Sequence, residues 1–168
     1  HQMTTDLLSL LRSSSGRVIT VSSGGMYAAP LPNIEAEELP EMTPAFYDGT
    51  RQYAIAKRMQ VTLNEMWAER ESEVAFASMH PGWADTAGVQ RSLPRFRKIL
   101  KSILRDAKSG ADTAIWLAAE RPSQPEEELV WFDRAVRTAH VYPHTRATRE
   151  TPQSLVAWLE AELARGPR

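Results

Sequence analysis

The 168-residue sequence predicts an α/β fold in which short parallel strands alternate with helices. Three short apolar runs, at residues 18–21, 74–78 and 129–132, have the length and the β-branched or aromatic content of buried strands. Longer segments with apolar residues at helical spacing separate these runs. Such alternation is typical of parallel βαβ units, so we expect a parallel sheet covered by helices.

The first predicted elements are a helix, a strand and a long connection. The apolar face of the helix consists of Leu7, Leu8, Leu10 and Leu11. This helix begins without a capping side chain, and the turn at residues 13–16 ends it. The strand at residues 18–21 leads into a connection, residues 24–50, that contains four prolines. A connection of that length inside a compact domain is usually functional.

The rest of the chain continues the alternation. Residues 51–70 are predicted to form a helix, because their apolar residues recur on one face. Residues 84–93 are polar and are predicted to form a loop. Residues 94–108 alternate basic and apolar side chains, which favours an amphipathic helix with a solvated basic face over a membrane or nucleic-acid surface. Ser109 is expected to cap the next helix, and residues 152–164 form the last one.

The composition excludes several classes of protein. Twenty basic and 21 acidic side chains nearly cancel, so no net field attracts nucleic acid. Cysteine is absent, which excludes disulfides and thiolate metal sites. No apolar run approaches the roughly 20 residues that span a bilayer, and the first residues do not resemble a signal peptide. We therefore expect a cytoplasmic protein with no nucleic-acid partner and no transmembrane segment.

Tyr53 and Lys57 are the strongest candidates for chemistry, because residues four apart share one face of a helix. A tyrosine hydroxyl ordinarily has a pKa near 10. An ammonium group about 4 Å away favours the ionised form by about 4 kcal/mol at an effective dielectric constant near 20, but by only about 1 kcal/mol in water. The pair can therefore exchange a proton with a substrate oxygen only in a cleft shielded from bulk water. Ser22 or Ser23, at a strand end, is placed to hold that oxygen.

These residues also have a purely structural explanation. A tyrosine and a lysine at this spacing arise by chance in roughly one such chain in ten, and two serines can simply end a strand. The order of the elements favours chemistry: a strand, Ser-Ser-Gly, a loop, the helix with Tyr53 and Lys57, and a second strand that ends at Pro81-Gly82 before Thr86.

Three strings make the chain recognisable: RVITVSSGGM from residue 17, YAIAK from residue 53 and SMHPGWADTAGV from residue 78. They resemble the serine strand, the Tyr-x-x-x-Lys motif and the Pro-Gly strand end of the short-chain dehydrogenase/reductase superfamily. The long loop before the tyrosine is similar to that of the retinol-dehydrogenase-like branch. The resemblance extends over residues 1–135 and implies a Rossmann-type doubly wound parallel sheet. Residues 1–168 would then form the C-terminal portion of a single domain.

The resemblance also implies a role for each matching residue. Tyr53 would be the general acid/base, with Lys57 favouring its ionised form and hydrogen-bonding the nicotinamide ribose. Ser23, rather than Ser22, would hold the substrate oxygen. The remaining cofactor contacts would come from Pro81, Gly82, Trp83 and Thr86. The cofactor would be NADP or NAD and the substrate a small carbonyl or alcohol compound. Residues 84–108 would cover this substrate, and their apolar side chains favour an apolar one.

Several parts of a complete family member have no counterpart in residues 1–168. These are the glycine-rich loop that holds the pyrophosphate, the Asn-Ala-Gly segment, the helical asparagine of the proton relay and the strand end that selects NAD or NADP. We therefore expect a piece of a longer protein that needs the N-terminal half to bind a dinucleotide and turns over little alone. The alternative is a catalytically silent α/β interaction domain that associates, as in a homodimer, through its first helix and the Tyr53 helix.

The histidines and Trp83 have structural explanations as well. His140 and His144 are four apart, but the proline between them breaks the helix that a zinc site of this spacing needs, so no metal site is predicted. His80 is expected to make a structural hydrogen bond at its strand end. Trp83 follows a strand where open α/β sheets bind ligands, so contact with cofactor or substrate and simple exposure stay open as alternatives.

Overall fold

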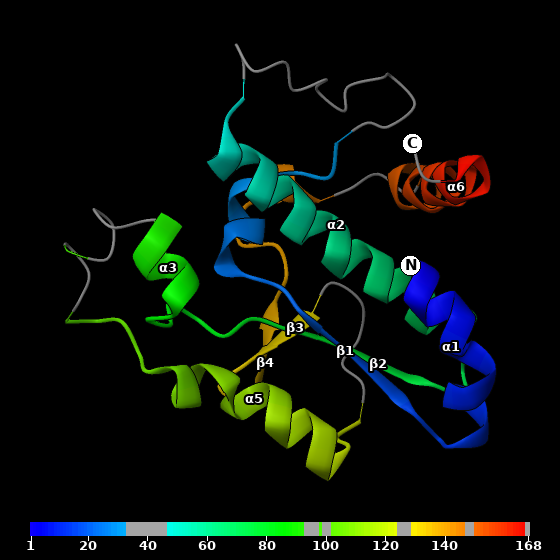
Figure 1. The fold of residues 1–168 in the computed structure, drawn as a ribbon, viewed down its shortest axis with the longest axis horizontal. Helices are drawn as coiled ribbons and strands as arrows, with labels where there is room; N and C mark the ends of the chain where they lie inside the picture. Colours follow the sequence, from blue (N-terminus) through cyan, green and yellow to red (C-terminus); the bar gives the residue numbers. More distant parts are fainter. Residues whose placement is uncertain (33–46, 93–97, 99–101, 124–128, 147–149, 167–168) are drawn as a thin grey trace.

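The computed structural model describes residues 1–32, 47–92, 98, 102–123, 129–146 and 150–166. Within these ranges a four-stranded sheet has the order β1-β2-β3-β4, with helices on both faces (Figure 1). The strands are Arg17–Val21 (β1), Ala75–Met79 (β2), Leu129–Phe132 (β3) and Ala135–Thr138 (β4). The helices are Gln2–Ser13 (α1), Gly49–Arg70 (α2), Ala87–Ser92 (α3), Ala107–Glu120 (α5) and Glu150–Arg165 (α6), with the short 3-10 helices Gly24–Ala28 (η1) and Pro143–Thr145 (η3).

The predicted α/β fold class is confirmed. β1, β2 and β3 run parallel, with Arg17 opposite Ala75 at the start of the first pair. The fourth strand, β4, is not among the predicted strands, and it pairs antiparallel with β3. Asp133 and Arg134 join these two strands with φ values of 49° and 56°, the conformation of a two-residue hairpin turn. The sequence does not predict this hairpin, because two-residue turns with positive φ normally contain glycine and this one does not.

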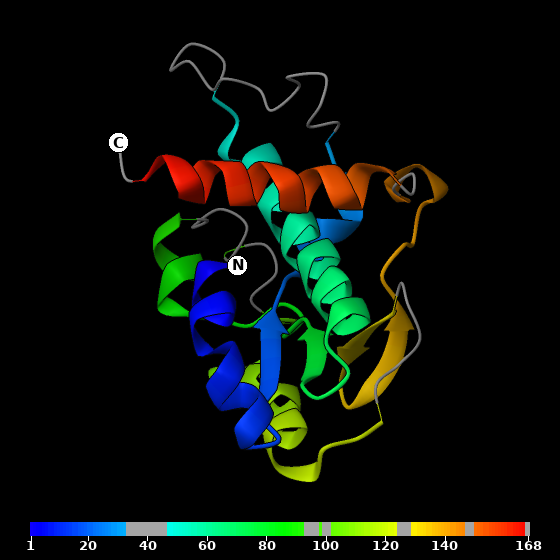
Figure 2. The same cartoon turned by 90° about the vertical axis from the view of Figure 1, so that its right-hand side faces the viewer.

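The helices form one layer on each side of the sheet. α2 and α5 cover opposite faces (Figure 1), and α6 lies across α2 (Figure 2). Beneath α2 the core consists of Met26, Val61, Val130 and Ala139. Beneath α5 it consists of Met79, Leu117 and Trp131. The apolar face of α1 is divided, because Leu8 and Leu11 pack near the end of α2 whereas Leu10 is 63% exposed.

The segment between β2 and α5 differs from the prediction in three places. Residues 87–92 form α3 instead of a loop, because so short a helix shows no periodic pattern. Residues 102–106 are a turn and an isolated bridge, since Arg105 N–H donates to the Trp83 carbonyl at 2.9 Å. Asp106, not Ser109, caps α5, and its carboxylate accepts the Ser109 N–H at 2.7 Å. Most of the rest of the predicted basic helix, at 94–97 and 99–101, lies outside the described residues.

Candidate active site

Tyr53 and Lys57 lie on one face of α2, near the helix N-terminus. The Lys57 ammonium is 5.7 Å from the centre of the Tyr53 ring. It donates to the Val21 carbonyl at the end of β1, at 3.1 Å, and to Gln60 Oε1, at 3.0 Å. A lysine ammonium has three N–H donors, so these contacts leave one for a ligand. The backbone of β1 therefore holds the lysine next to the tyrosine.

The two serines that follow β1 have different partners. Ser22 is buried, and its Oγ donates to the backbone carbonyl of Lys57 at 3.0 Å. Ser23 is half-buried and caps η1, where its Oγ accepts the N–H of Gly25 at 3.2 Å. Ser22 thus ties the strand end to α2. Ser23 accepts its bond and keeps its own O–H as a donor.

Gly25 lies between Ser23 and Tyr53. A Cβ on this glycine would be 3.2 Å from the Tyr53 ring and 3.7 Å from Ser23 Oγ. The Tyr53 ring and the Ser23 hydroxyl therefore both lie within 4 Å of the position that this Cβ would occupy. The sequence does not predict this role for Gly25, because the close approach depends on how η1 packs against α2.

The carboxyl end of β2 contributes a second group of candidate residues. Gly82 has a φ of 68°, which favours glycine, and its N–H donates to His80 Nδ1 at 3.3 Å. A Cβ there would be 3.0 Å from the Phe132 ring and 3.2 Å from Arg105 Nε. The hydrogen bond from the Gly82 N–H confirms the prediction that His80 makes a structural hydrogen bond. Pro81 is half-buried, whereas Trp83, at 53%, is exposed together with Thr86.

Parallel pairing brings the two groups to one edge of the sheet. The N–H of Ser22 donates to the Met79 carbonyl at 2.7 Å, so the chain leaves β1 and β2 at the same level. Ser23 follows one strand and Pro81-Gly82 follows the other. This is the edge at which open α/β sheets bind ligands.

The described residues do not form the shielded cleft that the tyrosine–lysine pair needs, because Tyr53 is 51% exposed. The proposed covering segment, residues 84–108, is closed at its base, where Asp85 N–H donates to the Arg105 carbonyl at 2.8 Å. Its middle, and residues 33–46 of the long connection, lie outside the described residues. Whether this segment covers a substrate therefore stays a prediction.

Arg58 is a buried residue that supports the candidate site, and the sequence does not predict its role. It is 1% exposed and donates to the carbonyls of Met26, at 2.8 Å, and Ala139, at 2.7 Å. A longer bond of 3.4 Å reaches the Ala29 carbonyl. Arg58 thus fastens η1 to the helix that carries Tyr53. One signal could have indicated burial, because Arg58 follows the apolar Ile55 by three residues and shares its face.

The described residues contain no group of three or more His, Asp or Glu side chains that could hold a metal ion. His140 makes hydrogen bonds within the protein: Nδ1 lies 3.0 Å from Thr145 Oγ1 and Nε2 lies 3.5 Å from Arg58. His144 is exposed and stacks on Tyr142. Within the same ranges, every helix is too short or too polar to cross a membrane.

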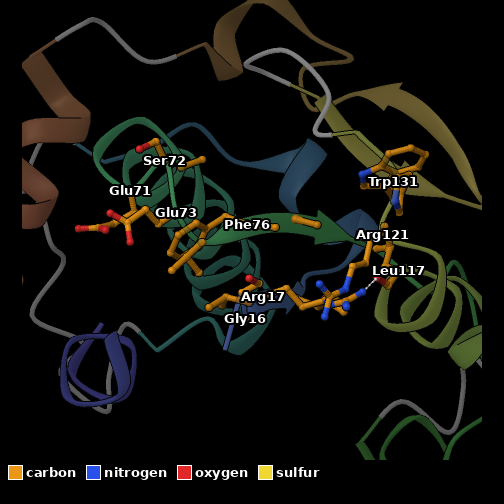
Figure 3. Close-up of a pocket in the computed structure, with 17 residues that line it drawn as sticks. Gly16, Arg17, Glu71, Ser72, Glu73, Phe76, Leu117, Arg121 and Trp131 are labelled. Carbon is orange, nitrogen blue, oxygen red and sulfur yellow. Dashed lines mark hydrogen bonds between the residues drawn. The ribbon is translucent and has the colours of Figure 1, made fainter. Parts of the chain in front are cut away.

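A cavity of about 340 Å³ lies at the other edge of the sheet (Figure 3). It is lined by the starts of β1 and β2 and by the ends of α2 and α5. Figure 3 shows Glu71 and Glu73 on one side of it and Arg17 and Arg121 on the other. Arg17 donates to the Leu117 carbonyl at 2.9 Å. Because it lies at the amino ends of the strands, this cavity is separate from the candidate site.

Comparison with known proteins identifies the family. Residues 1–124 match the family described as the NAD dependent epimerase/dehydratase family. The chain is 37% identical over 164 residues to "Dehydrogenase/reductase SDR family member 12" of Homo sapiens, and 39% identical over 168 residues to the protein of the same description in Bos taurus. These matches cover 96% and 98% of this chain but 50% and 51% of the relatives, so the chain spans about half the length of the curated relatives it matches. The resemblance to the short-chain dehydrogenase/reductase superfamily is confirmed, and the chain belongs to the NAD dependent epimerase/dehydratase family within it.

Proposed function

We propose that this chain is the C-terminal portion of a single Rossmann-type domain in an NAD(P)(H)-dependent oxidoreductase that interconverts a small carbonyl compound and an alcohol. Tyr53 is the general acid/base, and Lys57 and Ser23 assist it. One observation carries the proposal. The Lys57 ammonium lies 5.7 Å from the Tyr53 ring centre. The Tyr53 ring and Ser23 Oγ both lie within 4 Å of the position that a Cβ on Gly25 would occupy.

Each of the three side chains has a definite task. The nicotinamide cofactor, when bound, supplies or accepts the hydride. In the reducing direction the Tyr53 hydroxyl gives its proton to the carbonyl oxygen, and in the oxidising direction the tyrosinate takes it back. The O–H of Ser23 donates to the same oxygen and stabilises its developing charge. The Lys57 ammonium stabilises the tyrosinate, and its remaining N–H would donate to a ribose hydroxyl of the bound cofactor.

The donor set at this edge of the sheet fits the nicotinamide half of such a cofactor. Lys57 offers one N–H after its bonds to Val21 and Gln60. Four residues after β2 would line the nicotinamide: Pro81, Gly82, Trp83 and Thr86. The pyrophosphate contacts would come from the half of the relatives that this chain does not span. The choice between NAD and NADP would be made there as well.

An assay of hydride transfer tests the proposal. The protein encoded by the complete reading frame is incubated with NADPH or NADH and a panel of aldehydes and ketones, and the nicotinamide absorbance is followed. We expect oxidation of the cofactor that depends on the carbonyl compound. The alternative is a catalytically silent interaction domain. It would be favoured if the protein binds the cofactor in a fluorescence titration but no carbonyl compound in the panel causes oxidation of NADPH or NADH.

A further inference from the structure

His80 directly follows β2, and its imidazole ring makes contacts on one face and at both ring nitrogens. The side chain is 8% exposed, and its ring stacks on Phe132 with centroids 4.4 Å apart. Nδ1 accepts the Gly82 N–H at 3.3 Å, and Nε2 lies 3.3 Å from Tyr27 Oη. The Tyr27 O–H donates to the Thr138 carbonyl at 3.2 Å.

These hydrogen bonds select one form of the imidazole ring. A backbone N–H only donates, so the Nδ1 that faces Gly82 carries no proton. The neutral ring then carries its proton on Nε2 and donates it to Tyr27 Oη, whose own proton points to Thr138. Donors and acceptors alternate correctly along Gly82, His80, Tyr27 and Thr138 only when His80 is neutral.

The same chain of hydrogen bonds connects two parts of the candidate site. Gly82 belongs to the turn after β2, and Tyr27 belongs to η1, which also carries Gly25 against the Tyr53 ring. The Phe132 ring that stacks on His80 also packs on Gly82, where a Cβ would be 3.0 Å away. The imidazole therefore holds the turn in place from one side and η1 from the other.

We propose that neutral His80 is a positioning residue that holds the Pro81-Gly82 turn in its cofactor-binding conformation, and that a proton on Nδ1 releases this turn. The inference rests on the proposed function, because it takes the nicotinamide to lie against the turn. Protonation puts a donor opposite the Gly82 N–H, so their hydrogen bond is lost. Cofactor affinity then falls in proportion to the fraction of protein with a neutral ring.

Charged groups on two neighbouring segments face His80. Asp133 lies in the β3–β4 turn and is paired with Arg105, which lies over the Phe132 ring. Burial lowers the pKa of His80, Asp133 raises it, and Arg105 lowers it. Tyr27 is the titratable group on η1, and burial raises the pKa of its hydroxyl, so it keeps its proton at neutral pH. The pKa of His80 therefore lies below the ordinary histidine value near 6.5, and the ring is predominantly neutral at pH 7.

Two substitutions in the complete protein distinguish the role of the His80 hydrogen-bond acceptor from that of its aromatic ring. His80→Asn offers an amide oxygen to the Gly82 N–H and does not titrate, whereas His80→Phe keeps an aromatic ring and removes the acceptor. Dissociation constants for NADPH and NADH are measured by nicotinamide fluorescence from about pH 8 to about pH 5. We expect the affinity of the wild-type protein to fall progressively toward the acid end, as the fraction of protein with a neutral His80 ring falls. His80→Asn should bind with little pH dependence, and His80→Phe about tenfold more weakly at every pH.

A second readout needs no cofactor. Long-range ¹H–¹⁵N spectra of His80 should show the proton on Nε2 and none on Nδ1 at neutral pH. Tyr142→Phe, which alters an exposed tyrosine, is the matched control and should change neither readout. A proton on Nδ1 at neutral pH, or a pH dependence that His80→Asn leaves intact, overturns the inference alone. Failure of the wild-type protein to bind either cofactor at any pH overturns the proposed function and this inference with it.

Discussion

The Tyr53 ring lies against the backbone of Gly25, so closely that a Cβ on the glycine would be 3.2 Å from ring atom Cε1. Gly25 belongs to η1, which Ser23 caps and Arg58 fastens to α2 through the Met26 carbonyl. The position of the proposed acid/base is therefore set by a segment that precedes it by more than twenty residues in the chain.

Gly25→Ala tests this contact. The added methyl group should displace the Tyr53 ring and lower kcat about tenfold, because small errors in the placement of a reacting group are costly. The matched control is Gly24→Ala, since a Cβ on Gly24 would have no atom within 4 Å among the described residues. Steady-state kinetics of both variants provide the comparison. Equal kcat values would show that the Gly25 contact does not position the ring.

The two serines should separate stability from activity. Ser22→Ala removes the donor to the Lys57 carbonyl and should lower the free energy of unfolding by about 1 kcal/mol. Ser23→Ala should lower kcat about 100-fold, because it removes a hydrogen bond to the developing oxyanion, whereas Ser23→Thr keeps the hydroxyl and much of the activity. Urea unfolding and kinetics measure these effects. A larger loss of kcat in Ser22→Ala would reverse the assignment.

Arg58→Met should destabilise the fold. The change leaves the buried carbonyls of Met26 and Ala139 without their donor, so the free energy of unfolding should fall by about 3 kcal/mol. Arg51→Met is the control on the same helix, because the Arg51 side chain is exposed, and it should cost less than about 0.5 kcal/mol. Urea unfolding of both variants checks the prediction, which fails if they are equally stable.

Lys57→Ala should weaken cofactor binding as well as the rate. The variant loses the N–H that we assign to the ribose hydroxyl and the charge beside Tyr53, so the dissociation constant of the nicotinamide cofactor should rise about tenfold. Lys108→Ala, in which an exposed lysine of α5 is removed, is the control. Fluorescence titration measures both, and an unchanged dissociation constant in Lys57→Ala would remove the lysine from the cofactor site.

Spacing along the chain predicts part of the site. Tyr53 and Lys57 share a helix face because they are four residues apart, and Ser23 follows shortly after the strand β1, whose end contacts Lys57. Contacts between distant segments cannot be obtained in this way. Gly25 against Tyr53, and Arg58 with the Met26 carbonyl, depend on how η1 docks on α2. Spacing alone does not reveal that docking.

The same distinction applies to the fold. The apolar runs at β1, β2 and β3 are predicted at nearly the right residues. The prediction that the first of them is buried is wrong, because β1 lies at the end of the strand order, its residues are only half-buried and Val21 is 48% exposed. β4 is missed because its turn uses Asp133 and Arg134, which ion pairs with Arg105 and Asp112 help to hold. The cap of α5 is misassigned by three residues, although Asp106 precedes Ser109 at the spacing that a capping aspartate requires.

The turnover of Tyr53→Phe in the complete protein tests the central claim most directly, because only the hydroxyl is lost. We expect kcat to fall at least about 100-fold, with cofactor affinity and the free energy of unfolding close to those of the wild-type protein. Tyr142→Phe, which changes another exposed tyrosine, should retain full activity. A kcat in Tyr53→Phe within about twofold of the wild-type value, against the expected loss, would contradict the assignment of Tyr53 as the proton donor.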